Sequence, residues 1–194
     1  MVFDPQPPPR LTETLTGKLL VASPALGDPN FYRAVVLMCT HGTEGSFGVV
    51  LNRPLPTLAV DRVRAWGRDV AWPANLFAGG PVQPDVTFAV GLAATVRSEA
   101  WWTSIVQGLG LVSLNADPYE VLPSLVQFRI FAGYAGWRAG QLEAEIFGES
   151  WFVVDAHPAD ALTDEPERLW HNVLRRQPGQ LKMFAFVPED IAVN

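Results

Sequence analysis

The segment that most constrains the fold is a pair of apolar runs separated by a short polar connection. The first run is VVLMC at residues 35–39, the second is FGVVLN at 47–52, and THGTEGS joins them. Each run contains a pair of β-branched valines, and a glycine-containing connection of this length is typical of a hairpin. Neither run alternates polar with apolar residues, so we expect both faces of the hairpin to be covered and its strands to lie inside a sheet.

Further strands are predicted where short apolar runs are bounded by turn residues. They are placed at 19–22, 86–92, 111–115, 129–134 and 151–156, with one more inside NLFAGGPV that ends at Gly79-Gly80-Pro81, and a possible last strand at 181–187. Pro54 and Pro56 are expected to end the second hairpin strand.

Helices are predicted from apolar spacing and from capping residues. Residues 58–66 have helical spacing after Thr57, a candidate N-cap, and Gly67 can close that helix. Short helices are expected over 101–106 after Ser98, after Asp117-Pro118, and over the amphipathic stripe at 169–174. QLEAEIF at 141–147 alternates like a strand, but its residue types and its bracketing glycines favour a helix, which we predict.

The order of these elements indicates an α+β fold. Strands come in clusters with helices interspersed, which predicts a single domain at 11–194, a mainly antiparallel β-sheet or flattened barrel with flanking helices. A chain of 194 residues with 48% apolar composition can bury one substantial core. Residues 1–10 contain four prolines and are predicted to be a disordered or extended tail.

Cysteine content and hydropathy indicate the compartment. The one cysteine, Cys39, excludes a disulfide scaffold and suits a reducing cytosol. The first ten residues lack the apolar core of a secretory signal, and the longest uncharged stretch, 100–116, is too polar to span a membrane. We therefore predict a cytoplasmic protein that is not membrane-bound.

The charge distribution argues against nucleic acid as a partner. The net charge is −6, and residues 98–194 carry 6 basic against 13 acidic groups, while 1–97 carry 8 against 7. Binding a phosphate backbone requires a dense basic face. The nearest cluster, Arg62, Arg64 and Arg68, is interrupted by Asp61 and Asp69. Nucleic acid is thus an unlikely partner.

Catalytic and cofactor motifs are weak. The glycine spacing of GYAGWRAG does not match a dinucleotide fingerprint, and the three histidines show no metal-binding spacing, so no cofactor and no metal are predicted. Cys39 and His41 would share a face if the strand stayed extended, which would permit an activated thiol. The favoured interpretation is instead a core thiol followed by a turn histidine. No catalytic residue is assigned.

The candidate binding surface is built from loops and glycine-rich segments, where ligands reach the backbone most easily. It comprises His41, Glu44, Asn52, Gly79, Gly80, Trp137, Gln141 and Glu143. On a helix, Glu143 and Glu145 would point to nearly opposite sides, which argues against a paired acid and base.

Several longer sequence segments resemble those of one known family. GKLLVASPALGDPNFYRAVVLMCTHGTEGSFGVVLNRPL, AGGPV, FAGYAGWRAGQLEAEI and SWFVVDAHPADAL occur in the order found in the YqgE/AlgH family, from about residue 16 to 176. The resemblance implies an α+β fold and a bacterial cytosolic protein of unknown function. One branch of that family is labelled a transcriptional regulator, and the resemblance implies no catalytic residues.

These observations favour a non-enzymatic binding or regulatory module. Its expected partner is a protein or a small ligand, and its expected state is a monomer or a weak homo-oligomer. Two alternatives stay open: an enzyme using Cys39 and His41 or a nearby carboxylate, and an indirect transcriptional regulator.

Overall fold

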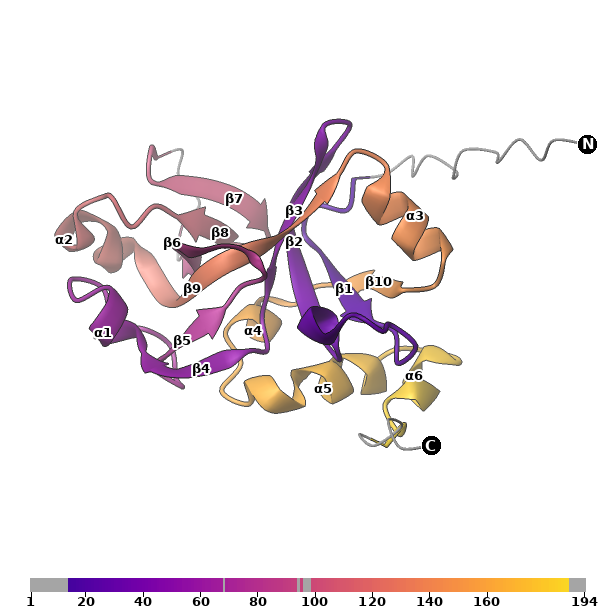
Figure 1. Cartoon of the computed structure of the whole chain (residues 1–194). Coiled ribbons are helices and arrows are strands. Elements are labelled where there is room, and N and C mark those ends of the chain that lie inside the picture. The colour runs from indigo at the N-terminus through magenta and orange to yellow at the C-terminus, as the bar shows by residue number, and fades with distance from the viewer. Residues whose placement is uncertain (1–13, 68, 94, 96–98, 189–194) are drawn as a thin grey trace, which may run out of the picture.

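The computed structural model describes residues 14–67, 69–93, 95 and 99–188, and its fold is α+β with a mainly antiparallel sheet, as predicted (Figure 1). The predicted Pro-rich tail at 1–10 and the predicted cap Ser98 lie outside the described residues. Within the described residues no helix is long and apolar enough to cross a membrane.

Ten strands are found in the described part of the chain. They are β1 (Lys18–Ala22), β2 (Val35–Gly42), β3 (Gly45–Val50), β4 (Pro54–Leu58), β5 (Asn75–Ala78), β6 (Val82–Ala93), β7 (Trp102–Val106), β8 (Leu109–Val112), β9 (Leu125–Arg138) and β10 (Trp151–Asp155). The α-helices are α1 (Ala59–Arg62), α2 (Pro118–Val121), α3 (Gln141–Phe147), α4 (Pro158–Ala161), α5 (Leu169–Arg175) and α6 (Leu181–Phe184). Short 3-10 helices are η1 (Pro29–Phe31), η2 (Leu122–Ser124) and η3 (Pro166–Arg168).

The long strand β9 joins the two halves of the molecule. The sheet order is β10-β1-β2-β3-β9-β6-β8-β7, and β5 pairs in parallel with β9 while β4 pairs with β5. The last residues of β9 pair with β3, whereas residues 125–134 pair with β6. In Figure 1, β4–β8 with α1 and α2 lie on one side of β9, and β1–β3, β10 and α3 lie on the other.

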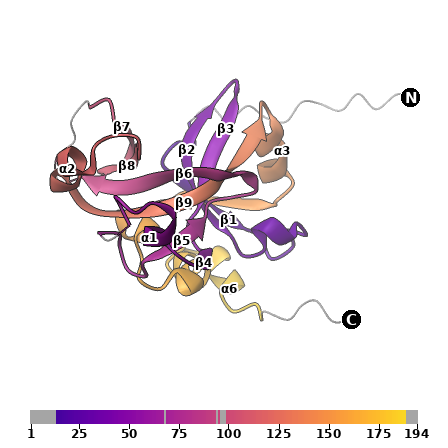
Figure 2. The same cartoon turned by 60° about the vertical axis from the view of Figure 1, so that its left-hand side comes forward.

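Apolar residues form three clusters, of which the first spans both halves of the molecule. One contains Leu19, Leu37 and Cys39 and is covered by α5. A second lies on the opposite face of β1 and β2, under α3 and around Trp137 and Trp151. The third fills the half built from β4–β8, around residues such as Trp66 and Phe128. Figure 2 shows α3 beside the β2–β3 hairpin at one end of the molecule.

The predicted hairpin is confirmed, and both of its strands are internal because β2 pairs with β1 and β3 pairs with β9. The strand β2 continues to Gly42, so His41 belongs to the strand and does not begin the turn. The register shifts between Met38 and Thr40, which places a β-bulge at Cys39. A bulge adds one residue and reverses the alternation of side chains beyond it.

The predicted helix at 101–106 is wrong, because this segment is strand β7 in a hairpin with β8. Gln107 and Gly108 connect the strands with φ of +46° and +81°. Two successive positive φ angles are characteristic of the type I′ turn that closes a tight hairpin.

Three further boundaries differ from the prediction. Residues 54–58 form strand β4, which begins at Pro54, so Thr57 lies in a strand and does not cap α1. The strand predicted at 129–134 is longer in the structure, where β9 begins at Leu125 and continues through the glycine-rich segment to Arg138. The possible last strand is instead α6, in which Leu181 and Phe184, three residues apart, both pack against the core covered by α5.

Candidate functional site

Helix α3 is positioned by glycines at both ends and by one buried leucine. Gly140, at φ of +75°, precedes its first residue, and the Gly148 N–H donates to the Ala144 carbonyl at its end. Leu142 is fully buried and Ile146 packs on the same cluster. The predicted helix at 141–147 is therefore confirmed, and its polar residues are divided between two sides.

The carboxylate of Glu145 connects α3 to two strands. Its Oε2 accepts hydrogen bonds from Trp137 Nε1 on β9 and from Trp151 Nε1 on β10, each at 2.8 Å. Its Oε1 accepts from Gln141 Nε2 at 2.9 Å, one helical turn earlier. Gln141 in turn accepts from the backbone N–H of Arg138 at 3.1 Å. Two indoles and one amide thus hold this side chain in one position.

Three aromatic rings meet beside Glu145. The ring centroid of Phe31 lies 6.2 Å from that of Trp137 and 5.3 Å from that of Trp151, and the two indoles are 6.0 Å apart in an edge-to-face arrangement. Phe31 is stacked on Trp137 and lies edge-to-face with Trp151. Stacked and edge-to-face pairs are the favourable geometries for ring quadrupoles. The indoles are 6% and 3% exposed, so their N–H groups have little access to water.

A cleft of about 250 Å³ opens at this triad, and we call it the aromatic-acidic cleft. It is lined by Leu26, Asp28, Phe31, Pro81, Gly136, Trp137, Gln141, Glu145 and Trp151. Its two charged lining residues, Asp28 and Glu145, are both acidic. Aromatic faces combined with carboxylates form an environment that attracts a cation.

His41 and Glu143 form a separate contact on the other side of α3. Leu15 N donates to His41 Nδ1 at 3.2 Å, and His41 Nε2 lies 3.2 Å from Glu143 Oε1. Because Nδ1 accepts a hydrogen bond, the ring proton is on Nε2, which donates to the carboxylate. Both side chains are largely buried. The pair therefore joins the start of the described chain and strand β2 to α3.

Cys39 takes no part in this arrangement. Its side chain lies in the core covered by α5, and its Sγ is 3.7 Å from the Leu37 carbonyl oxygen. Burial raises the pKa of the thiol well above its ordinary value, which disfavours the reactive thiolate. The bulge at Cys39 directs His41 to the opposite face, toward Leu15 and Glu143. The extended geometry that would pair thiol and imidazole is therefore not present.

The residues of the predicted binding surface do not form one site in the structure. Trp137 and Gln141 line the aromatic-acidic cleft, and Gly80 directly precedes its lining residue Pro81. His41 and Glu143 lie on the far side of α3, and Glu44 is exposed at the hairpin tip between β2 and β3.

The remaining predicted residues have other roles. Asn52 lines a different pocket beside α5. A Cβ on Gly79 would lie 2.2 Å from the Gly133 carbonyl oxygen, and one on Gly80 would lie 2.2 Å from the Tyr134 carbonyl carbon. Both glycines are thus required by close backbone packing against β9.

Sequence reasoning missed the centre of the cleft. From the sequence, Glu145 is considered only as a possible partner of Glu143, and Trp151 only as the first residue of a predicted strand. The spacing of Gln141 and Glu145, four residues apart, signals a shared helix face. The indole partners could not be found from spacing, because Trp151 comes from another strand. Among the described residues, no group of three or more His, Cys, Asp and Glu side chains is placed to hold a metal ion.

Comparison with known proteins finds one matching family and close sequence relatives. Residues 19–182 match the DUF179 family, described as AlgH-like. A UPF0301 protein of Streptomyces coelicolor is 48% identical over 93% of this chain and 96% of its own, and one of Thermobifida fusca is 45% identical over the same shares.

Two solved structures share the fold. A crystal structure of a protein from Corynebacterium diphtheriae superposes with a TM-score of 0.85 at 32% identity, covering 92% of this chain and 95% of that one. The solution structure of the AlgH protein from Pseudomonas aeruginosa gives a TM-score of 0.69 at 27% identity, covering 93% and 97%.

Proposed function

Since this chain belongs to the AlgH-like family, for which no specific molecular function is established, we propose from its own residues that it is a binding module. The aromatic-acidic cleft is its recognition site. The group it recognises is a cation, an ammonium or guanidinium carried by a small ligand or by a side chain of a partner protein.

The observation that carries this proposal is the position of the Glu145 carboxylate among three aromatic rings. An ionised carboxylate has about four lone-pair sites, and three donors already occupy part of them, which leaves capacity for one more donor. Phe31 is half-buried and offers a ring to an entering cation, and exposed Asp28 adds a second negative charge. The site is held by hydrogen bonds before any ligand arrives, which lowers the entropic cost of binding.

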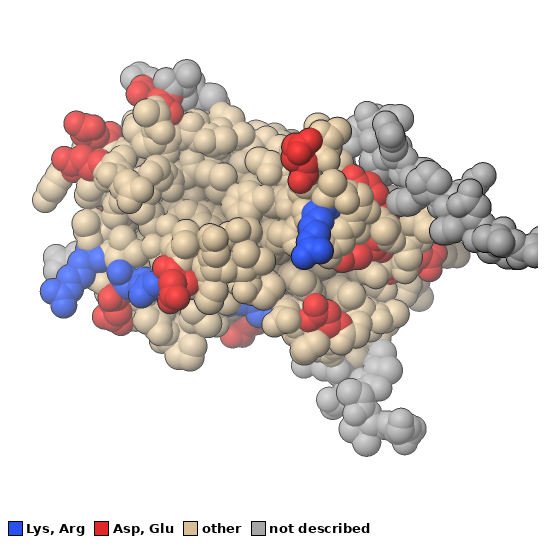
Figure 3. All heavy atoms as spheres, turned by 45° about the horizontal axis from the view of Figure 1, so that its top comes forward, with Lys and Arg blue, Asp and Glu red and all other residues tan. Residues whose placement is uncertain are grey.

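A volume of about 250 Å³ suits a single side chain or a small amine. A binding role is favoured over thiol catalysis because the Cys39 sulfur lies within the core. On the face shown in Figure 3, blue basic side chains are few and red acidic ones lie among them, which agrees with a cationic ligand better than with a phosphate backbone. A cytosolic location completes the proposal, since Cys39 would remain a thiol there.

The proposal is tested by NMR titration with matched ligands. N-acetyl-arginine methylamide and N-acetyl-lysine methylamide carry the charge, and N-acetyl-citrulline methylamide is the neutral counterpart of the first. The indole N–H signals of Trp137 and Trp151 report on the cleft because both groups donate to Glu145. Trp170 serves as the internal reference, since its indole donates to the Ala22 carbonyl in the buried core.

We expect saturable shifts of the two reporter signals with one or both cationic compounds, with the Trp170 signal unchanged. Glu145→Gln keeps an acceptor oxygen and removes the charge, so it should weaken binding by about tenfold. Equal shifts with the citrulline compound would show that charge is not recognised. Shifts that are absent with both cationic compounds would refute the proposal.

A further inference from the structure

A second pocket, of about 770 Å³, lies where helix α4 and the segment after it meet the end of β6 and the start of β9. We call it the Trp72 pocket. It combines apolar side chains with a small number of polar ones, which is the usual composition of a small-molecule site. It is lined by Trp72, Leu92, Gln127, His157, Pro158, Ala159, Leu162, Thr163 and Asp164.

Trp72 presents an indole that the core does not use. It is 73% exposed, and it lines the pocket beside apolar side chains, so its ring area is open to a ligand. The backbone that carries it is fixed on both sides. The Ala71 N–H donates to the Phe128 carbonyl at 2.7 Å, and the Trp72 carbonyl accepts from Arg129 Nη2 at 2.8 Å.

Arg129 joins the two walls of the pocket from behind. It is fully buried, and its Nη2 also donates to the Thr163 carbonyl at 2.7 Å, while its Nη1 donates to the Ala161 carbonyl at 3.2 Å. Burial lowers the pKa of Arg129 to about 10, and the negative charge of Asp164 raises it, so this carboxylate lies near the buried cation. One guanidinium thus holds the loop of Trp72 against the segment that carries Asp164, which positions both before a ligand arrives.

Three polar side chains of the pocket have hydrogen-bonding capacity to offer. The Trp72 indole has an N–H donor, the Gln127 amide has donors and an acceptor, and the Asp164 carboxylate only accepts. Within the described residues, none of the three side chains makes a hydrogen bond or an ion pair. Gln127 is paired with Leu92 across β6 and β9, so the two side chains share a face of the sheet. A ligand in this pocket therefore meets an aromatic face together with both donors and acceptors.

We propose that the Trp72 pocket binds the purine base of a nucleoside, with guanine as the preferred base. The flat base stacks on the Trp72 indole, an interaction that any base can make. Guanine carries adjacent N–H donors on N1 and N2, which match the two oxygens of the Asp164 carboxylate in a bidentate contact. Its O6 and N7 atoms are acceptors for the Gln127 amide.

The charge of the pocket favours a nucleoside without phosphate. Asp164 would repel a phosphate group, and among the described lining residues there is no lysine or arginine. Arg129 is enclosed by protein and donates to backbone carbonyls. Because a guanine within a nucleic acid carries phosphates on its sugar, the same argument favours the free nucleoside over a nucleic acid.

The test is a calorimetric and NMR titration of the full chain with guanosine, inosine and guanosine 5′-monophosphate. Inosine differs from guanosine only in lacking the exocyclic amino group, and the monophosphate measures the effect of the phosphate. Trp72→Ala removes the ring but keeps the carbonyl that Arg129 holds. Asp164→Asn keeps the shape of the side chain and removes its charge.

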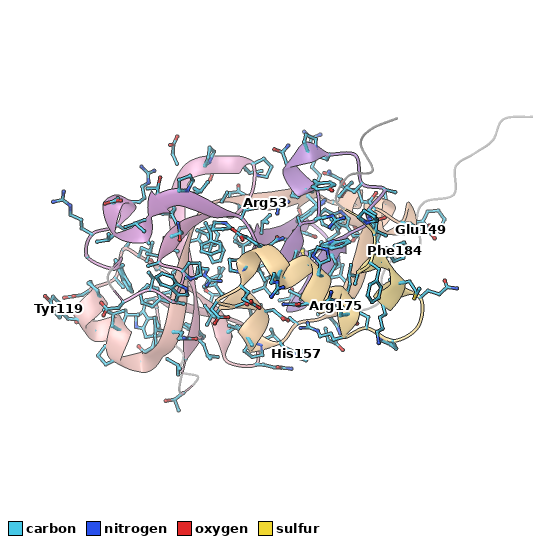
Figure 4. All side chains as sticks on the ribbon, turned by 90° about the horizontal axis from the view of Figure 1, so that it is seen from below. Arg53, Tyr119, Glu149, His157, Arg175 and Phe184 are labelled. Atoms are coloured by element: carbon cyan, nitrogen blue, oxygen red, sulfur yellow. The ribbon has the colours of Figure 1, made fainter. Side chains whose placement is uncertain are left out.

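Tyr119→Ala is the matched control for Trp72→Ala. Tyr119 is 88% exposed and does not line the pocket. Figure 4 shows it at one end of the molecule, away from the pocket residue His157.

We expect saturable guanosine binding that shifts the Trp72 indole signal and leaves those of Trp137 and Trp151 unchanged. Inosine should bind about tenfold more weakly, and the monophosphate more weakly than guanosine. Trp72→Ala should weaken guanosine binding by about tenfold or more, while Tyr119→Ala leaves it unchanged. Asp164→Asn should remove most of the preference for guanosine over inosine.

Four outcomes would overturn the proposal: absence of saturable binding at millimolar guanosine, equal weakening by Tyr119→Ala and Trp72→Ala, inosine binding as tight as that of guanosine, or tighter binding of the monophosphate. Thermal unfolding checks that each variant is folded, and if Trp72→Ala is not, the Asp164→Asn result decides. Because the Trp137 and Trp151 signals report on the aromatic-acidic cleft, this result is independent of the one for that site.

Discussion

Replacing Glu145 by alanine should destabilise the protein through the two indoles that lose their acceptor. Trp137 and Trp151 are 6% and 3% exposed, so water cannot readily replace the carboxylate. An unsatisfied buried donor costs about 1–3 kcal/mol, which gives about 2–6 kcal/mol for the pair. Glu145 itself is partly exposed, which admits some water to the vacated space. We therefore expect the lower part of this range, about 2–4 kcal/mol.

The free energy of unfolding is measured by urea denaturation followed by far-ultraviolet circular dichroism, with an unchanged m-value as the sign that the folded state is intact. Glu145→Gln retains an oxygen for both indoles and should cost only about 1 kcal/mol. Glu44→Ala, at the exposed hairpin tip, is the surface control and should stay within about 0.5 kcal/mol of the wild type.

A double-mutant cycle isolates the hydrogen bond. Trp137→Phe removes one donor, so Glu145→Ala should cost less in that background than in the wild type. The reasoning is refuted if Glu145→Ala stays within about 0.5 kcal/mol of the wild type, or if Glu145→Gln costs as much as Glu145→Ala.

Three further predictions concern other parts of the molecule. Gly80→Ala should lower the free energy of unfolding by about 2–4 kcal/mol in the urea assay, because φ is +151° and a Cβ would lie 2.2 Å from backbone atoms. The control is Gly27→Ala, which has open space around it and should change the free energy of unfolding by less than about 0.5 kcal/mol. Native Cys39 should react with iodoacetamide about 100-fold more slowly than the urea-unfolded chain, as followed by mass spectrometry, because burial raises the thiol pKa; comparable rates would contradict its place in the core. The hydrogen bond from Lys18 lowers the pKa of Asp155, so this pair stabilises the fold above the ordinary Asp pKa of about 3.9 and loses that effect as the pH falls through the lowered value. Carbon-13 titration of Asp155 should therefore show a higher pKa in Lys18→Met than in the wild type, and equal values would count against the ion pair.

The elements that the sequence predicted well are those whose signal is local. The runs at 35–39 and 47–52 are largely apolar and each contains two valines, and they form the internal hairpin. Asp117 accepts from Tyr119 N, so the predicted cap of α2 is confirmed. The bracketing glycines around 141–147 bound a helix as predicted.

The errors arise where a local pattern permits two structures. Trp102 and the apolar residues after it could have formed a helix, but the turn at Gln107 and Gly108 pairs them with β8. Residues 133–138 contain glycines that suit a turn, yet they extend β9 because β3 supplies their hydrogen-bonding partners. Pairing partners that are distant in the sequence decided both cases.

The candidate site also combines features set by the local sequence with features set by partners distant in the sequence. The amino-acid order alone determined that α3 is a helix with Gln141 and Glu145 on one face, since a period of about 3.6 residues is a local property. Only the tertiary structure brought Trp151 and Phe31 to that face, and only the bulge at Cys39 turned His41 away from the thiol. The physical reason is that hydrogen bonds and ring contacts between separate strands depend on their register, which is set by the packing of the whole sheet.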